Sequence, residues 1–153
     1  MKNQPLNSDQ KIIFQKFCNV FLPPTNNKRK YKSNELDYVS SSLNRVFYQN
    51  FGFNLSRDHV RDNFIEMGYQ IFTKGGVWDP DEKKFKPSAS STMVKVVAPQ
   101  ADPETLYTYF NISPTMISSL RRTTVKLQQN TNESKRKEIE DLKDKIREFA
   151  ESI

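Results

Sequence analysis

Three segments near the start of the chain carry apolar side chains at helical spacing, and each is bounded by residues that begin or end helices. Ser8, Ser33 and Ser56 are hydroxyl residues of the kind that cap a helix N-terminus. A Pro-Pro pair stops the first segment because proline cannot continue a helix, and Gly68 is a natural end for the third. The predicted helices are 8–22, 34–50 and 57–67.

The following segment, 69–98, changes from helical to extended character. Residues 69–72 are mostly aromatic or β-branched and 92–98 contains three valines, so both stretches favour strands. Gly75-Gly76 suggests a turn, whereas 79–91 is polar and loop-like. Three helices followed by a hairpin resemble the winged-helix arrangement, in which the hairpin is the wing. The alternative is a small β-element that only covers the core.

Two further helices are predicted after these strands, over 103–110 and 114–129. The first rests on Leu106 and Phe110, which lie four residues apart. The second has Ser113 in a position to cap it, followed by a proline that suits the first helical position.

Residues 133–153 are strongly helical in composition, with oppositely charged side chains at four-residue spacing such as Glu133 and Lys137. The apolar residues follow alternating steps of three and four, as in a coiled-coil seam. This seam is either a homodimer surface, through 139–153, or the face by which a terminal helix packs on its own domain. Its members are Ile139, Leu142, Ile146, Phe149 and Ile153.

Basic residues outnumber acidic ones by 24 to 18, which gives a net charge of +6 and an isoelectric point near 9.4. The excess favours an anionic partner such as nucleic acid, although a soluble domain with a basic surface has the same composition. Four positive charges fall within 28–32. This basic run is either solvated surface or a flexible arm that contacts phosphates. Its charged residues are Lys28, Arg29, Lys30 and Lys32.

The chain lacks the sequence signatures of common catalytic sites. It has one cysteine, Cys18, and one histidine, His59, which argues against a disulfide and against a zinc site. Its few glycines form no phosphate-cradling motif, and no nucleophile elbow surrounds the histidine. The polar N-terminus and the lack of a long apolar run predict a cytoplasmic protein without a membrane span. We therefore expect a protein that is not an enzyme and takes no metal or cofactor.

Two of the predicted helices have the position of a DNA-recognition helix, and the face opposite the apolar stripe distinguishes them. On 57–67 that face is acidic and would oppose phosphates, since it carries Asp58, Asp62 and Glu66. On 114–129 it carries groups that can donate to phosphate oxygens or base edges. These groups are Thr115, Ser118, Arg122, Lys126 and Gln129, with Arg121 on a flank. A core helix with a basic solvated face would have the same pattern.

The stretch 106-LYTYFNISPTMISSLRR-122 resembles the helix-turn-helix signature of bacterial and phage DNA-binding proteins. Asn111 takes the turn position usually held by glycine, where asparagine tolerates the left-handed conformation. The buried positions of the signature are matched by Leu106, Phe110, Ile112, Ile117 and Leu120. The resemblance implies that the exposed start of the second helix reads the major groove. It nominates Thr115, Ser118, Ser119 and Arg122 as contacts.

These patterns and the resemblance predict a mainly α-helical fold with a small β-hairpin, arranged as a winged-helix or helix-turn-helix-like core with a C-terminal helix. The compact domain covers 8–129 with the wing at about 69–98, and 133–153 is an amphipathic helix. The expected function is binding of double-stranded DNA, as a transcriptional regulator or replication accessory. The alternative is a structural or adaptor protein of a viral particle or another assembly, with Trp78 as an interface anchor.

Overall fold

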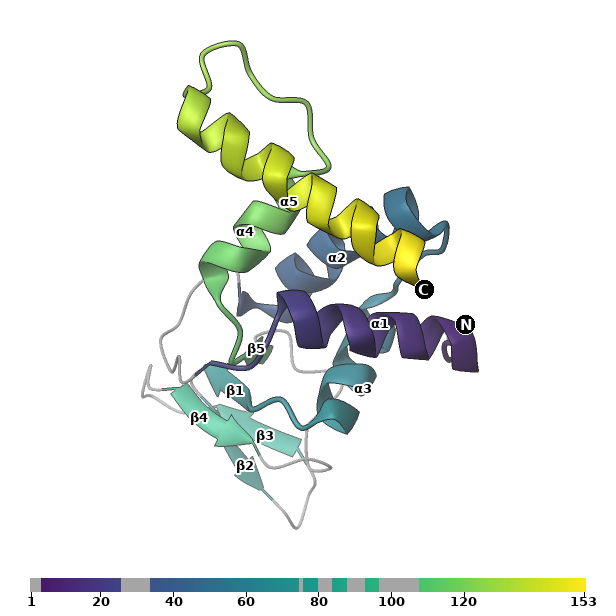
Figure 1. The fold of residues 1–153 in the computed structure, drawn as a ribbon. Coiled ribbons are helices and arrows are strands. Elements are labelled where there is room, and N and C mark those ends of the chain that lie inside the picture. The colour runs from purple at the N-terminus through teal and green to yellow at the C-terminus, as the bar shows by residue number, and fades with distance from the viewer. Residues whose placement is uncertain (1–3, 26–33, 75, 80–83, 88–92, 97–107) are drawn as a thin grey trace.

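The computed structural model describes residues 4–25, 34–74, 76–79, 84–87, 93–96 and 108–153. This part of the chain is mainly helical, as the sequence predicts, and the strands gather at the end of the molecule opposite the C-terminal helix (Figure 1). The helices are α1 (Ser8–Phe21), α2 (Leu36–Phe51), α3 (Arg57–Met67), α4 (Pro114–Arg122) and α5 (Glu133–Ser152). The strands are β1 (Ile71–Lys74), β2 (Gly76–Asp79), β3 (Lys84–Pro87), β4 (Met93–Val96) and β5 (Thr108–Phe110).

Local capping explains the bounds of α1 and α3. The cap of α1 is Asn7 and not Ser8, because the Asn7 side chain accepts from the Gln10 N–H at 2.8 Å. The Gln10 side chain accepts in return from the Asn7 N–H at 3.1 Å, which completes a capping box. The predicted bounds of α3 are confirmed: Ser56 caps its start, and Gly68 ends it with a left-handed φ of 86°.

α2 begins at Leu36, later than the predicted start at residue 34. The predicted cap, Ser33, lies outside the described residues, and the observed cap position is held by Glu35, whose side chain makes no capping hydrogen bond. The Asn34 amide is used elsewhere, since it donates to two carbonyl oxygens, one at the end of β5 and one in the turn before α4. These acceptors are Phe110 at 3.1 Å and Ile112 at 3.0 Å. A contact with a distant segment therefore holds residue 34 outside the helix.

The strands form a three-stranded sheet in the order β4-β1-β5 and a separate ribbon of β2 and β3. The antiparallel pairing of β1 with β4, which places Ile71 opposite Val96, confirms the two predicted strands. The β2–β3 ribbon occupies a stretch in which the polar residues 79–91 predict only a loop. It contains Trp78, which pairs in register with Phe85.

The predicted helix 103–110 is wrong over 108–110, because these residues form strand β5. β5 pairs antiparallel with β1, and its Phe110 side chain is only 1% exposed. Aromatic and β-branched side chains fit a half-buried sheet, so strand pairing outweighs the single four-residue step from Leu106 to Phe110. A strand therefore stands where the helix-turn-helix signature expects the end of its first helix; residues 103–107 lie outside the described ranges.

Asn111, between β5 and α4, connects three parts of the chain through its buried side chain. Its Oδ1 accepts from the Gln70 N–H at 2.8 Å, and its Nδ2 donates to the Thr25 carbonyl at 3.1 Å. Main-chain bonds reinforce both links, at 3.2 Å from Asn111 N–H to Gln70 and at 2.8 Å from Thr25 N–H to Asn111. The turn before α4 is therefore tied to the segments that follow α1 and α3.

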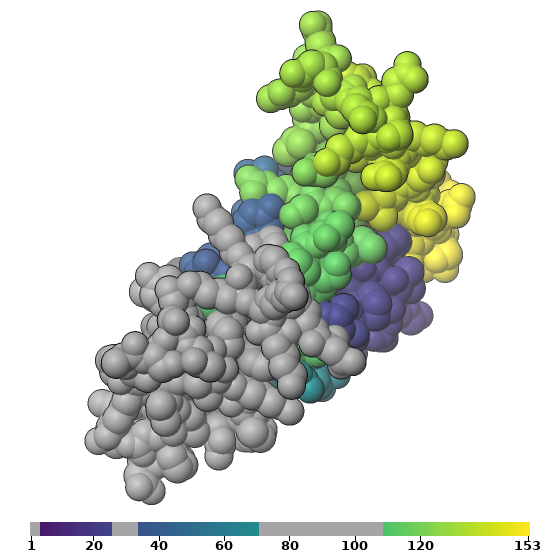
Figure 2. All heavy atoms as spheres, turned by 90° about the vertical axis from the view of Figure 1, so that its left-hand side faces the viewer, coloured from purple at the N-terminus to yellow at the C-terminus, as the bar shows by residue number. Residues whose placement is uncertain are grey.

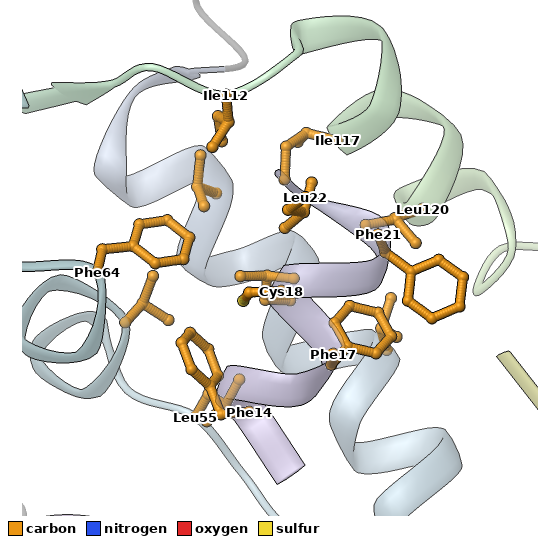
Figure 3. Close-up of a cluster of buried hydrophobic side chains, with 14 of the residues drawn as sticks. Phe14, Phe17, Cys18, Phe21, Leu22, Leu55, Phe64, Ile112, Ile117 and Leu120 are labelled. Atoms are coloured by element: carbon orange, nitrogen blue, oxygen red, sulfur yellow. The ribbon is translucent and has the colours of Figure 1, made fainter. Parts of the chain in front are cut away.

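Phenylalanine rings from α1, α2 and α3 meet in the core, and Figure 3 shows those of α1 and α3 among aliphatic side chains. Phe14 of α1 lies 5.6 Å from Phe47 and 5.8 Å from Phe64, measured between ring centroids, and all three side chains are fully buried. Ile117 and Leu120 of α4 close the same core. Each aromatic ring buries a large area, so a chain with 35% hydrophobic residues still forms one continuous core.

α5 packs on its own domain, which is one of the two alternatives that its sequence leaves open. Ile139 and Ile146 are 4% and 1% exposed, and the Phe149 ring lies 5.8 Å from the Phe17 ring of α1. Ile153, the last residue of the seam, is 48% exposed. Most of the seam is therefore occupied within the chain, and no dimer through it is proposed.

The burial of Cys18 leads to a prediction for alkaline pH. Desolvation raises the pKa of the buried thiol well above its ordinary value. As pH rises, the thiol of the unfolded chain, with a pKa of about 8.5, loses its proton before the thiol of the folded chain does. The stability that Cys18 contributes is therefore complete below that pH. It falls as pH rises toward the pKa of the folded state. We expect the free energy of unfolding to fall by about 1 kcal/mol between pH 8 and pH 9.5 from this group alone.

Urea denaturation at the two pH values measures this loss, and Cys18→Ala is the matched control. The variant is less stable throughout, but its stability should fall less with pH because the thiol is absent. Burial and the nearby Cys18 both raise the pKa of Tyr69, so the difference between the two proteins reports Cys18 together with its effect on Tyr69. Equal alkaline losses in the two proteins would contradict the prediction.

Candidate nucleic-acid interface

α4 starts where Ser113 and Pro114 favour a helix N-terminus. The Ser113 hydroxyl accepts from the Met116 N–H at 3.3 Å, and Pro114 occupies the first turn, where its missing N–H costs no hydrogen bond. Ile117 and Leu120 are fully buried and fix which face of the helix points inward. The opposite face is thereby turned outward.

α4 ends at Arg122, so the predicted helix 114–129 is wrong beyond that residue. The hydroxyls of Thr123 and Thr124 each donate to the carbonyl three residues earlier, at 2.6 and 2.7 Å. The same carbonyls accept from the backbone N–H groups of Thr123 and Thr124, at 3.2 and 3.1 Å, so a tightened turn at the threonine pair satisfies the last carbonyls of the helix. Lys126 consequently lies in the connection to α5 and not on the helix.

The outward face of α4 carries the four residues nominated by the helix-turn-helix resemblance. Thr115 and Arg122 are exposed, and Ser118 and Ser119 are half-buried. Figure 2 shows the green side chains of α4 at the surface, with α2 on one side and α5 on the other. Lys126, which follows shortly after the end of α4 in the chain, is also exposed. The basic run 28–32 lies outside the described residues.

Arg121 turns toward α2, where its guanidinium carbon lies 5.1 Å from the centroid of the Tyr38 ring. Partial burial raises the pKa of Tyr38, but hydrogen bonds from Arg121 and Ser118 and the positive charges of Arg121 and Arg122 outweigh this effect, so the pKa lies below its ordinary value. Tyr38 is a site residue that the sequence does not reveal, because nothing in α2 distinguishes it from the other tyrosines of the chain.

On its other side, α4 borders α5 across a groove of about 200 Å³. Ser119 and Arg122 line the groove from α4, and Lys135, Glu138 and Leu142 line it from α5. α5 therefore flanks α4 along this side of the helix.

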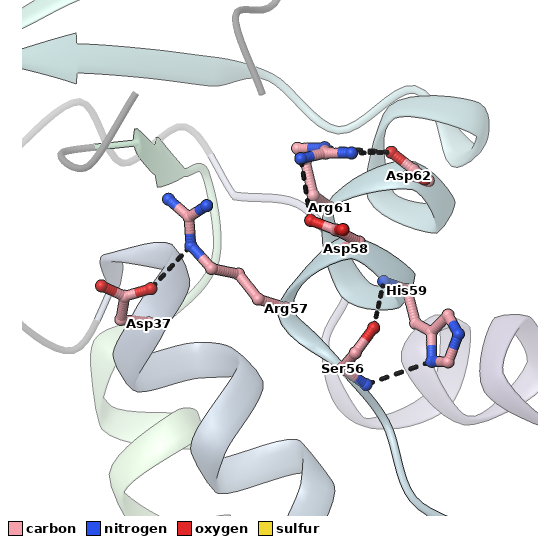
Figure 4. Close-up of polar contacts among 7 residues, drawn as sticks. All are labelled: Asp37, Ser56, Arg57, Asp58, His59, Arg61 and Asp62. Atoms are coloured by element: carbon pink, nitrogen blue, oxygen red, sulfur yellow. Dashed lines mark hydrogen bonds and ion pairs between the residues drawn. The ribbon is translucent and has the colours of Figure 1, made fainter. Parts of the chain in front are cut away.

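The rival face on α3 is acidic, as the sequence predicts, and its arginines are held in ion pairs (Figure 4). Arg57 contacts Asp37 of α2 at 2.7 Å. Arg61 contacts Asp58 at 3.1 Å and Asp62 at 2.8 Å. Both arginines are therefore engaged within the protein.

His59 has a structural role at the start of α3. Its backbone N–H donates to the Ser56 hydroxyl at 3.1 Å, while its ring Nδ1 accepts from the Ser56 N–H at 3.1 Å. The ring Nε2 lies 2.6 Å from the Gln4 carbonyl, which fits a neutral ring that donates from Nε2. Nδ1 therefore takes part in the cap of α3, and Nε2 takes part in the contact with Gln4, which precedes α1.

Comparison with protein-family models, with curated proteins and with solved structures gave no match, so the site is interpreted from its own geometry. Within the described ranges, no helix combines the length and the apolar character that a membrane crossing requires. The same ranges contain no cluster of three or more histidine, cysteine or acidic side chains placed to hold a metal ion.

Proposed function

We propose that this protein binds double-stranded DNA through the outward face of α4, as a transcriptional regulator or replication accessory. Arg121 and Arg122 are the main phosphate contacts in this proposal, and Thr115, Ser118 and Ser119 supply hydroxyl donors. Lys126 adds a positive charge shortly after α4 in the chain, and the basic run 28–32 adds four more in the sequence.

The observation that carries the proposal is the difference between the arginines of α3 and those of α4. Arg57 and Arg61 are bound by aspartates. Among the described residues, by contrast, no carboxylate forms an ion pair with Arg121 or Arg122. A cation without a bound carboxylate can meet a phosphate without first breaking an ion pair, and releases counterions when it does.

We also propose a winged-helix-like core made of α2, α3 and the paired strands β1 and β4. A turn at Gly52, with a φ of 76°, joins the two helices, and β1 follows α3, while its antiparallel partner β4 comes after β2 and β3 in the chain. In such a core α3 would be the DNA-facing helix, but its acidic face opposes phosphates. The proposal therefore assigns the DNA contacts to α4, and makes them largely electrostatic.

Replacing Arg122 with glutamine should weaken duplex binding roughly 5- to 10-fold at about 0.1 M salt, because one charge-assisted phosphate contact is lost. The slope of log K against log salt concentration should become shallower by about 0.9, the contribution of one neutralised phosphate. A fluorescence-anisotropy titration of a labelled duplex at several salt concentrations measures both quantities.

Lys16→Gln on α1 is the matched control, since it removes the same charge from an exposed position on another helix. It should leave the salt slope of the parent nearly unchanged. If Arg122→Gln binds as tightly as the parent, the assignment to α4 is wrong. If the parent shows no salt-sensitive duplex binding, the adaptor alternative gains support, and light scattering would then look for a large assembly.

A further inference from the structure

The groove between α4 and α5 has a cation on each of its two walls. Arg122 lines it from α4, and Lys135, in the first turn of α5, lines it from the other side. Both residues are exposed, so a partner in solution can reach their charges. The groove therefore continues the positive surface of α4 onto a second helix.

Neither of these two charges is neutralised within the protein. Among the described residues, no carboxylate forms an ion pair with Arg122 or Lys135, although Glu138 lines the same groove. Later in α5, by contrast, Lys143 contacts Glu140 at 3.5 Å. The groove thus holds two cations that can meet an external anion without first breaking an ion pair.

The start of α5 is fixed, so Lys135 keeps its place beside α4. The Asn132 side chain caps the helix and accepts from the N–H groups of Ser134 at 2.8 Å and of Lys135 at 3.2 Å. The neighbouring Arg136 donates to the Thr131 carbonyl at 3.1 Å, which ties the helix to the connection before it. The backbone of Lys135 is therefore held in position, while its ammonium group stays accessible.

The other residues that line the groove narrow the choice of anion. Three of them, Met116, Ile139 and Leu142, are apolar, and Ser119 adds a half-buried hydroxyl. A lone inorganic anion would leave the apolar surface unused. The backbone of DNA alternates charged phosphates with sugars whose carbon atoms can contact apolar side chains, and its phosphates also accept from serine hydroxyls. The lining therefore suits a sugar–phosphate strand.

We propose that one strand of duplex DNA lies along the groove between α4 and α5, with phosphates at Arg122 and Lys135 and a sugar against the apolar side chains. The proposal rests on the DNA-binding function proposed above, and it extends the contacts from α4 to the start of α5. Because Glu138 lines the same groove, its carboxylate repels the bound strand and lowers the affinity.

Two opposite charge changes in the groove test this proposal by fluorescence-anisotropy titration of a labelled duplex at several salt concentrations. Lys135→Gln should bind roughly three- to tenfold more weakly at about 0.1 M salt, with a slope of log K against log salt concentration that is shallower by about 0.9. Glu138→Gln should bind roughly two- to fivefold more tightly, because it removes a repulsive charge and keeps the shape of the side chain.

Each change has a matched control on the same helix. Lys137 is exposed on the opposite side of the same helical turn as Lys135 and is not among the described residues that line the groove. Glu148 is exposed toward the other end of α5. Lys137→Gln and Glu148→Gln alter the net charge as the two test variants do, and both should bind nearly as the parent does.

The outcomes separate this proposal from the proposed function. If Lys135→Gln and Lys137→Gln weaken binding equally, the two charges act only through the overall field and the groove contact is refuted. If Lys135→Gln binds like the parent while Arg122→Gln binds more weakly, the groove is refuted and the DNA-binding face of α4 stands. If the parent does not bind duplex DNA, the proposed function itself fails. Circular dichroism of each variant confirms that a loss of binding is not a loss of fold.

Discussion

Replacing Phe17 with alanine is expected to lower the free energy of unfolding by about 3–5 kcal/mol, the usual cost of removing a buried phenylalanine ring. Phe17 is fully buried on α1, and its ring contacts rings from α1, α2 and α5. Its removal therefore loosens three helices together. The centroid distances are 4.6 Å to Phe21, 4.9 Å to Phe47, 6.0 Å to Phe51 and 5.8 Å to Phe149.

Chemical denaturation followed by circular dichroism measures this loss. Phe17→Leu should cost less, because leucine fills part of the volume and leaves a smaller cavity. Ile12→Ala on the same helix removes a side chain that is 49% exposed, and should cost well under the Phe17→Ala change. Similar losses for Ile12→Ala and Phe17→Ala would contradict the assignment of Phe17 to the centre of the core.

The second large effect is expected for Ile146→Asp on α5. Ile146 is 1% exposed, so aspartate at this position would place an unpaired carboxylate in the core. We expect α5 to detach, with a loss of about 3 kcal/mol or more in the free energy of unfolding. Hydrogen exchange should show faster exchange of the α5 amides than of the α2 amides.

Ile153→Asp makes the same chemical change at a seam position that is 48% exposed, and should have little effect on stability or exchange. The pair also tests whether α5 serves its own chain. If the seam joined two molecules, Ile146→Asp would turn a dimer into a monomer, and the stability of the parent would depend on protein concentration. A concentration-dependent midpoint would therefore contradict packing in cis.

The helices that could be predicted from the sequence are those whose bounds are local. α3 has its capping serine and its terminal glycine next to the apolar stripe, and α5 has a regular seam, so both were predicted closely. The start of α2 and the strand β5 depend instead on contacts between distant segments. The bond from Asn34 to Phe110 and the pairing of Phe110 with Ile71 have no local signal in the sequence.

The candidate site was predictable only on one helix. Helical spacing placed Thr115, Ser118 and Arg122 on one face of α4, because Ile117 and Leu120 mark the inner side. The early end of α4 coincides with a tightened turn at Thr123 and Thr124, which composition alone does not decide. Tyr38 joins the face only because α2 and α4 pack together, so no pattern within either helix points to it.

The hydrogen bonds of Asn34 and Asn111 restrict how α4 can be placed on the rest of the domain. Apolar side chains attract one another at many relative positions. A purely apolar interface would therefore let a short helix slide or rotate against the helices on which it packs. Amide groups with directional bonds to Thr25, Gln70 and Ile112 accept one setting only. These bonds fix the position and the rotation of the short helix α4 relative to α2. They do so even if the surrounding rings change rotamer.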